Sequence, residues 1–134
     1  MRARLQLVFG ACVTCIFLCV LTSLWANISS YYNEVALKEL AQRLDVAPTF
    51  TDVARYVDRI IEDGMSREEV EVTLSQIAPL EVTHRGKLTT RGGLEPYVCD
   101  DLLLQVGPFN ANLSFSACYY GEGKALFNFE YKSS

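Results

Sequence analysis

Hydrophobic residues dominate the start of the chain and give way to mixed patterns after it. An uncharged apolar run extends from Leu5 to Trp25, preceded by Arg2 and Arg4. As an α-helix, these 21 residues would rise roughly 30 Å, which matches the hydrocarbon thickness of a bilayer. The pattern therefore predicts a transmembrane helix at residues 5–25 behind a short N-terminal segment at residues 1–4.

Basic residues predict the orientation of this helix, because Lys and Arg favour the cytoplasmic side of a spanning segment. Both arginines precede the apolar run, and no basic residue follows it until Lys38. Trp25, Tyr31 and Tyr32 suit the outer interfacial belt, where amphipathic aromatic rings accumulate. We therefore expect a single-pass protein of the cell (inner) membrane, with a cytoplasmic N-terminus and a periplasmic or extracellular C-terminal domain.

Three other interpretations of the apolar run are weaker. A cleaved signal peptide has a shorter apolar stretch and small residues before the cut, whereas Leu24-Trp25-Ala26 is a poor cleavage site. A lipoprotein signal needs a sufficient apolar run before its cysteine, but only residues 5–8 precede Phe9-Gly10-Ala11-Cys12. A buried core helix is disfavoured because no charged residue interrupts the run.

Three cysteines lie inside the predicted helix at spacings of three and four, so Cys12, Cys15 and Cys19 share one face. The simplest interpretation is that they act as small, soft apolar side chains. A second interpretation notes that small residues four positions apart let membrane helices approach closely. It predicts packing against another membrane helix through Gly10, Ala11, Thr14, Cys15 and Cys19.

Helical periodicity continues after the anchor. Residues 31–45 carry apolar residues on one face, either as a continuation of the anchor helix or after a break near residues 27–30. A second amphipathic segment, FTDVARYVDRIIEDG, follows Pro48 and stops near Gly64. The apolar positions of the two segments are Leu37, Leu40, Ala41, Leu44, Val53, Tyr56, Val57, Ile60 and Ile61.

The next helix is predicted to begin with a capping box, in which Ser66 accepts from the backbone of Glu69 and the Glu69 side chain reaches back. Val70, Leu74 and Ile77 form its apolar face, and a proline at position 79 closes it. The acidic residues around its first turn suit the helix dipole. We therefore interpret them as stabilising the helix, in preference to a metal or catalytic cluster.

From position 81 onward the pattern changes to a period of two, which is typical of strands. Residues 81–90 predict one strand, followed by a turn-rich loop at Arg91-Gly92-Gly93. A stronger signal pairs residues 97–106 with 111–120 around the loop Gly107-Pro108-Phe109-Asn110. The facing apolar pairs are then Leu104 with Leu113, Leu102 with Phe115, and Val98 with Tyr119.

The same register places Cys99 directly opposite Cys118. If Val106 and Ala111 close the loop as a hydrogen-bonded pair, the cysteines form a non-hydrogen-bonded pair with Cα atoms about 4.5 Å apart. An exported domain lies in an oxidising compartment, where such a pair forms a disulfide. We expect a structural bridge, because the sequence has no CxxC motif or activating base that would support redox chemistry.

A further strand follows the turn at residues 121–123, and the alternation predicts that Ala117 faces Phe127, Phe115 faces Phe129 and Leu113 faces Tyr131. One apolar sheet face needs one covering layer, which the preceding helices can supply. The predicted fold is α+β: an N-terminal transmembrane helix, then two or three helices packed on one face of a three-stranded antiparallel meander. Asp100 falls on the apolar face, so we expect it at the sheet's rim or at a bulge.

Charge and length limit the function classes further. Without the two N-terminal arginines, the chain has 10 basic and 16 acidic residues, a net charge of −6, which argues against nucleic-acid binding. About 100 residues follow the anchor, enough for one small domain. We expect a helical linker at residues 26–49 and an extracytoplasmic domain at residues 50–134.

Candidate catalytic residues are few. His84 is the only histidine, and Asp100 and Asp101 are adjacent, so they would point to opposite faces of a strand. The sequence contains no Gly-rich phosphate loop and no HExxH or GxSxG motif. We therefore expect no catalytic, cofactor-binding or metal site, and we interpret His84 as an ordinary strand or loop residue.

The segment IIEDGMSREEVEVTLSQIAP resembles the SmpA/OmlA group, the BamE-like domains of bacterial envelope proteins. That family has a Gly-Met-Ser/Thr step, a helix with a buried Val and Leu, and a Gly-Pro or similar exit. The matching residues are Gly64, Met65, Ser66, Val70, Leu74 and Pro79. The resemblance extends over residues 50–132 and implies non-enzymatic roles: docking within membrane-protein assemblies, or inhibitor-type binding in the related β-lactamase-inhibitor fold.

The expected function is that of a single-pass membrane-anchored envelope protein whose extracytoplasmic domain docks on or scaffolds a membrane-protein complex. Its expected partners are the lipid bilayer and another membrane protein. Exposed aromatic residues favour interfaces, so Tyr97, Phe109 and Tyr120 are the candidate partner contacts, together with the sheet edges. The alternative is a secreted inhibitor or ligand-binding module, released by signal-peptide cleavage near Ala26.

Overall fold

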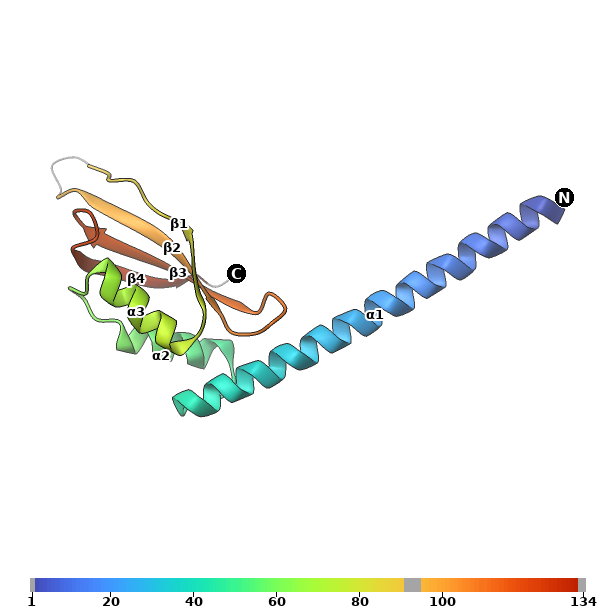
Figure 1. The fold of residues 1–134 in the computed structure, drawn as a ribbon, viewed down its shortest axis with the longest axis horizontal. Coiled ribbons are helices and arrows are strands. Elements are labelled where there is room, and N and C mark those ends of the chain that lie inside the picture. Colours follow the sequence, from blue (N-terminus) through green and yellow to red (C-terminus); the bar gives the residue numbers. More distant parts are fainter. Residues whose placement is uncertain (1, 91–94, 133–134) are drawn as a thin grey trace.

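Three helices precede a four-stranded antiparallel sheet in the computed structural model, which describes residues 2–90 and 95–132, with side chains from residue 9 onward. The helices are α1 (Arg2–Leu44), α2 (Phe50–Ile60) and α3 (Arg67–Ile77). The strands are β1 (Leu80–His84), β2 (Tyr97–Gln105), β3 (Asn112–Tyr120) and β4 (Ala125–Lys132), in the order β1-β2-β3-β4. The predicted α+β class is confirmed, and α2 and α3 lie on one side of the sheet (Figure 1).

The sheet has one strand more than the predicted three-stranded meander. β1 pairs with β2 and places Leu80 opposite Leu104, which extends the apolar face. The strand expected at residues 81–90 is shorter than predicted, because its pairing with β2 shifts between Val82 and His84, and the later contact is an isolated bridge between Thr89 and Tyr97. The turn-rich loop expected at residues 91–93 lies outside the described residues.

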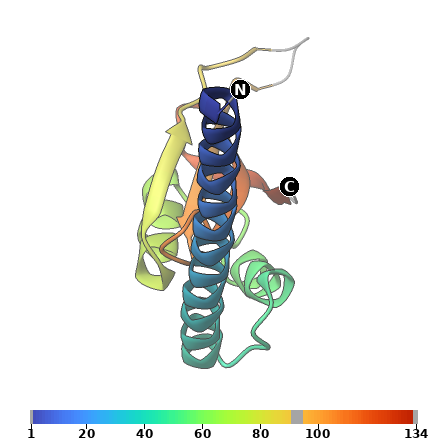
Figure 2. The same cartoon turned by 90° about the vertical axis from the view of Figure 1, so that its right-hand side faces the viewer.

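α1 is a single uninterrupted helix, so the chain does not break at residues 27–30. Its apolar half extends far from the domain, and Figure 2 shows this half in front of the sheet and helices. From position 9 onward it contains a segment long and apolar enough to cross a membrane, and the side chains of that segment are unburied. In contrast, Leu37, Leu40 and Ala41 near the other end of α1 are buried in the domain core.

A residue with a left-handed backbone conformation follows the last residue of α1. Asp45 has φ 57°, and its amide donates to the carbonyl of Gln42. The next amide, that of Val46, donates to the carbonyl of Ala41, which completes a Schellman motif and satisfies carbonyls that the helix end leaves free. The chain then turns back toward α2, whose N-cap Thr49 accepts from the backbone of Asp52.

The predicted capping box of α3 is confirmed. Ser66 accepts from the amide of Glu69, and the Ser66 amide donates to the Glu69 carboxylate over 2.7 Å. That hydrogen bond from Ser66 lowers the pKa of Glu69 below its ordinary value. The predicted apolar face of α3 packs into one core with residues of α2 and the sheet. The fully buried residues of this core include Val53, Val57, Val70, Leu74, Leu104, Leu113, Phe115 and Tyr119.

The link between α2 and α3 is joined to β4 by backbone hydrogen bonds. Gly64, with φ 90°, donates to the carbonyl of Leu126 over 2.7 Å. The amide of Leu126 donates in turn to the carbonyl of Met65 over 2.7 Å. The Gly-Met-Ser step therefore starts a helix and also covers part of the free edge of β4.

The predicted register of the β2–β3 hairpin is confirmed. Val106 donates to the carbonyl of Ala111, and the pairing continues to Tyr97 opposite Tyr120. Cys99 and Cys118 face each other with Cα atoms 4.0 Å apart and form a disulfide. The bridge therefore connects the strands at the end of the hairpin that is remote from its loop.

The predicted register between β3 and β4 is wrong by two residues. Phe115 faces Tyr131 and Ala117 faces Phe129, instead of Phe129 and Phe127. One residue of the shift arises because the turn includes Lys124, so that Tyr120 pairs with Ala125. The second arises at an irregularity between Cys118 and Tyr119, where an extra β4 residue enters the pairing.

The interpretation of Asp100 as a rim or bulge residue is also wrong. Its side chain is fully buried in the middle of a regular stretch of β2–β3 pairing, opposite Ala117. It is accommodated on the apolar face because two arginines from outside the sheet neutralise it. A single strand pattern does not reveal such partners, since they lie 33 and 15 positions away in the sequence.

The disulfide is expected to stabilise the domain by restricting the unfolded chain across 19 positions. The variant Cys99→Ser/Cys118→Ser should lose about 3 kcal/mol of unfolding free energy in urea titrations. The variant Cys12→Ala/Cys15→Ala/Cys19→Ala is the control, because these cysteines are free, and it should retain wild-type stability. Equal stability of the Ser variant and the wild type under non-reducing conditions would contradict this assignment.

Candidate functional site

The outer face of the sheet, turned away from α2 and α3, carries a group of three aromatic residues. Tyr97 and Tyr120 are direct partners across β2 and β3. The ring of Phe127 from β4 stacks on Tyr120 with centroids 4.4 Å apart and meets Tyr97 edge-on at 6.0 Å. Tyr120 is 43% exposed and the other two are half-buried. We call these three residues the outer aromatic cluster.

The sequence predicted two members of this cluster and missed the third. Strict alternation along β4 placed Phe127 on the inner face with Phe129. The pairing irregularity beside Tyr119 changes the alternation, so Leu126 takes the buried position and Phe127 lies among the outer residues. The preceding turn contains Gly121 and Gly123 with positive φ, but these signals do not reveal the additional shift.

Phe109, the third predicted contact, lies at the opposite end of the hairpin. Its amide donates to Oδ1 of Asn33, and its carbonyl accepts from Nδ2 of Asn33, both over 3.0 Å. Its ring meets Trp25 edge-on at 5.5 Å and lies 6.2 Å from Tyr32. β2 alone spans roughly 25 Å between the two ends of the hairpin. The structure therefore separates Phe109 from the outer aromatic cluster.

These contacts of Phe109 form a helix–hairpin junction, made of Trp25, Tyr32, Asn33 and Phe109. Gly107 permits the close approach, because a Cβ atom there would lie 2.6 Å from Oδ1 of Asn33. Asn33 offers one acceptor and one donor to a single residue, so it replaces the backbone partner that the loop lacks. No local motif around Asn33 indicates this role.

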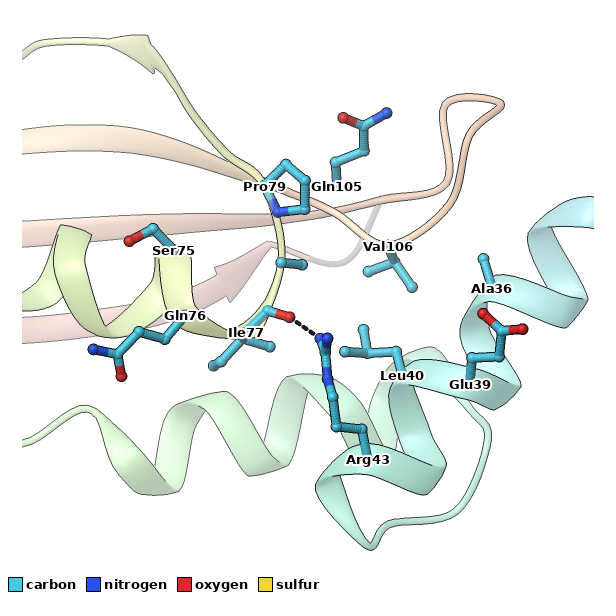
Figure 3. Close-up of a pocket in the computed structure, with 11 residues that line it drawn as sticks. Ala36, Glu39, Leu40, Arg43, Ser75, Gln76, Ile77, Pro79, Gln105 and Val106 are labelled. Carbon is cyan, nitrogen blue, oxygen red and sulfur yellow. Dashed lines mark hydrogen bonds between the residues drawn. The ribbon is translucent and has the colours of Figure 1, made fainter.

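A groove of about 660 Å³ lies where the buried end of α1 meets the end of α3 and the start of the β2–β3 loop. Figure 3 shows Leu40, Ile77 and Val106 around it, with Glu39 and Gln105 at its sides. The guanidinium of Arg43 reaches across the groove and donates to the carbonyl of Ile77. This contact satisfies a carbonyl at the end of α3 and ties α1 to α3.

A buried ion pair fixes α3 against the inner face of the sheet. Nε of Arg67 lies 2.7 Å from Oδ2 of Asp100, a close ionic contact without hydrogen-bond alignment, and Nη2 of Arg67 donates to Oδ1 over 3.1 Å. The amide of Gly86 also donates to Oδ1, over 2.9 Å. Arg85 lies 3.5 Å from Oδ2 and pairs with Glu71 through two hydrogen bonds. Oδ1 of Asp100 therefore accepts two hydrogen bonds and Oδ2 is held by ionic contacts alone, which suits a structural role.

Tyr119 packs beside this ion pair, with its ring centroid 5.7 Å from the Arg67 guanidinium carbon. Its hydroxyl is buried and forms no hydrogen bond with any of the described residues. Burial, followed by the negative charge of Asp100, raises the pKa of Tyr119 well above its ordinary value. Asp101 points away from this network and pairs with Lys132, so the two aspartates lie on opposite faces, as the sequence predicted.

The small-residue face of α1 is exposed along its length. Thr14 donates to the carbonyl of Gly10, and Cys15 and Cys19 are free thiols. Packing of this face, with Ala11, against another membrane helix stays a prediction. His84 is exposed at the end of β1, and across residues 2–90 and 95–132 the structure contains no cluster of His, Cys, Asp or Glu suited to a metal ion.

Breaking the buried ion pair should destabilise the domain. Asp100→Leu leaves the Arg67 guanidinium without its carboxylate, so the unfolding free energy in urea should fall by about 3 kcal/mol. The double variant Asp100→Leu/Arg67→Met should lose less than the single variant, because it buries no unpaired charge. Asp101→Leu removes an exposed pair and should cost under about 1 kcal/mol. Equal losses for Asp100→Leu and Asp101→Leu would refute this ranking.

The raised pKa of Tyr119 predicts alkaline destabilisation. The folded state holds the phenolic proton more tightly than the unfolded chain does, so its contribution is complete below the ordinary pKa of 10.0 and is lost as the pH rises toward the folded value. Tyr119→Phe should therefore flatten the fall in unfolding free energy above pH 10, and Tyr120→Phe, an exposed control, should not. Parallel curves for wild type and Tyr119→Phe would contradict the assignment.

Comparison of the chain with protein-family models, curated proteins and solved structures found no match. The resemblance to the SmpA/OmlA group therefore remains a prediction from the local motif. In the structure, the residues of that motif are structural: Ser66 caps α3, Val70 and Leu74 are buried, and Met65 pairs with β4.

Proposed function

We propose that this chain is a single-pass membrane-anchored envelope protein whose exported domain docks on a membrane-protein complex through the outer aromatic cluster. The observation that carries the proposal is the meeting of Tyr97, Tyr120 and Phe127 on the sheet face that α2 and α3 leave uncovered. Tyr and Phe are enriched at interface centres, where they bury a large area at a small cost in side-chain entropy.

The surroundings of the cluster support docking. Polar positions continue along the same face, including Ser116 on β3 and Asn128 and Glu130 on β4. An apolar centre with a polar rim is the usual arrangement of a non-obligate interface. The two cysteines of the disulfide lie two residues from Tyr97 and Tyr120, so the bridge holds the backbone beneath the aromatic rings in one register.

The membrane-anchoring part of the proposal is supported by the apolar, unburied half of α1. Basic residues at positions 2 and 4 favour a cytoplasmic N-terminus. The disulfide between Cys99 and Cys118 fits an oxidising compartment on the other side. These features favour an anchored, exported domain. Such a domain suits the docking role that the SmpA/OmlA resemblance also implies.

Photo-crosslinking can test the docking surface. A benzophenone amino acid at Tyr120 should give adducts with another membrane protein in intact cells, and the same group at Val72, an exposed residue of α3, should not. Tyr120→Ser should reduce co-purification of the captured protein by roughly 10-fold or more, which corresponds to the loss of one interface anchor. Val72→Ser should leave the yield unchanged.

Two outcomes would overturn this function. Equal adduct patterns at positions 120 and 72 would remove the outer aromatic cluster as the docking surface. An intact mass that lacks the residues before Ala26, with release from membranes by carbonate, would support the secreted inhibitor or ligand-binding module instead.

A further inference from the structure

The orientation of Phe109 relative to α1 suggests a contact other than docking on a protein. The backbone of Phe109 is fixed at Asn33, but its ring meets Trp25. Trp25 lies eight residues before Asn33, which corresponds to roughly 12 Å along the helix axis. The ring is therefore directed along α1 toward the apolar segment, and Figure 1 shows the β2–β3 loop extending from the sheet toward the part of α1 nearer the domain.

The depth of Trp25 sets the depth of Phe109. Trp25 is the last residue of the apolar run that begins at Leu5, and it is the only tryptophan of the chain. A tryptophan at the end of a spanning helix lies in the interfacial layer of the bilayer. With ring centroids only 5.5 Å apart, Phe109 reaches the same layer.

The distribution of charge is consistent with this depth. Between Leu102 and Gly121, across the last four residues of β2, the whole hairpin loop and all of β3, the sequence has no charged residue. The facing part of α1 is uncharged as far as Asn33. Pro108 and Asn110 are exposed at the tip. An uncharged tip with an aromatic ring can enter the interfacial layer without the cost of removing a charge from water.

The tip is also held in place before any lipid is met. Asn33 bonds both backbone groups of Phe109, and Gly107 admits the loop to the helix surface. Because the loop is fixed to the same helix that crosses the membrane, insertion requires little further ordering of the chain.

We propose that the β2–β3 loop, Gly107–Asn110, is a second membrane contact, which inserts Phe109 among the lipid headgroups and upper acyl chains beside Trp25. This inference rests on the proposed membrane anchoring. The occupant of the surface is lipid, and the loop would orient the domain with the outer aromatic cluster directed away from the bilayer.

Tryptophan quenching in vesicles tests the proposal with the full chain. In phosphatidylcholine vesicles with bromine near the headgroup end of the acyl chains, native Trp25 reports the anchor. Phe109→Trp in a Trp25→Phe background should lose fluorescence to a similar extent. Tyr120→Trp in the same background, at the other end of the hairpin, should not be quenched.

The outcomes separate the two proposals. Quenching of Trp25 without quenching at position 109 would overturn the loop contact and leave the anchor intact. Absence of quenching at Trp25 would overturn both. Equal quenching at positions 109 and 120 would also overturn the loop contact, because the domain would then lie flat on the bilayer.

A second measurement uses the unmodified sequence, in case the tryptophan variants do not fold. Phosphatidylcholine with a photoactivatable diazirine near the headgroup should form adducts with the peptide that contains Phe109 and with the peptide that contains Trp25. Adducts confined to α1, or capture of Phe109 by another protein in native membranes, would overturn the lipid contact.

Discussion

The burial of the C-terminal end of α1 in the domain core is the constraint on which the rest of the structure depends. Leu37, Leu40 and Ala41 share one apolar cluster with α2, α3 and the inner face of the sheet. Because these residues belong to the same uninterrupted helix as the apolar segment, the domain core holds that segment directly through α1. The Arg43 contact with α3 and the Asn33 contact with the hairpin loop add polar connections on either side of this apolar contact.

The inner and outer faces of the sheet differ in composition and in role. The inner face is apolar except for Asp100, whose charge is matched by Arg67 from α3 and by Arg85 from the segment after β1. The ion pair therefore ties α3 to the end of β1 and to β2, two segments that the strand pairing already brings together. The outer face of an antiparallel sheet needs no covering layer for stability, so its aromatic residues are free for the docking role proposed above.

Short-range patterns predicted most of the elements. Periods of 3.6 and two located α2, α3 and the β2–β3 hairpin, and the Ser66 capping box is a local motif whose partners are three residues apart. The hairpin register, and with it the Cys99–Cys118 bridge, followed because both strands are adjacent in sequence and share one apolar face. Of the three aromatic residues predicted to be exposed at the ends of the hairpin, only Tyr120 is exposed, and Tyr97 and Phe109 are half-buried.

The errors have a common physical origin. The β3–β4 register depended on one additional turn residue and on a pairing irregularity, neither of which changes the apolar composition of β4 enough to be recognised. β1 is short and half-exposed, so its alternation is weak. Asn33 and Arg67 act on partners 76 and 33 residues away, and a polar residue on a helix gives no sign of such a distant contact.

The continuity of α1 has a geometrical consequence for the whole molecule. An α-helix turns by roughly 100° per residue, so, with its apolar half held in a membrane as proposed, one inserted or deleted residue between Trp25 and Asn33 would rotate the domain about the helix axis by more than a quarter turn. The length of this short stretch therefore sets the rotational orientation of the domain about the axis of α1. In the proposed membrane-anchored protein, this orientation would determine which neighbour in the membrane plane the sheet faces.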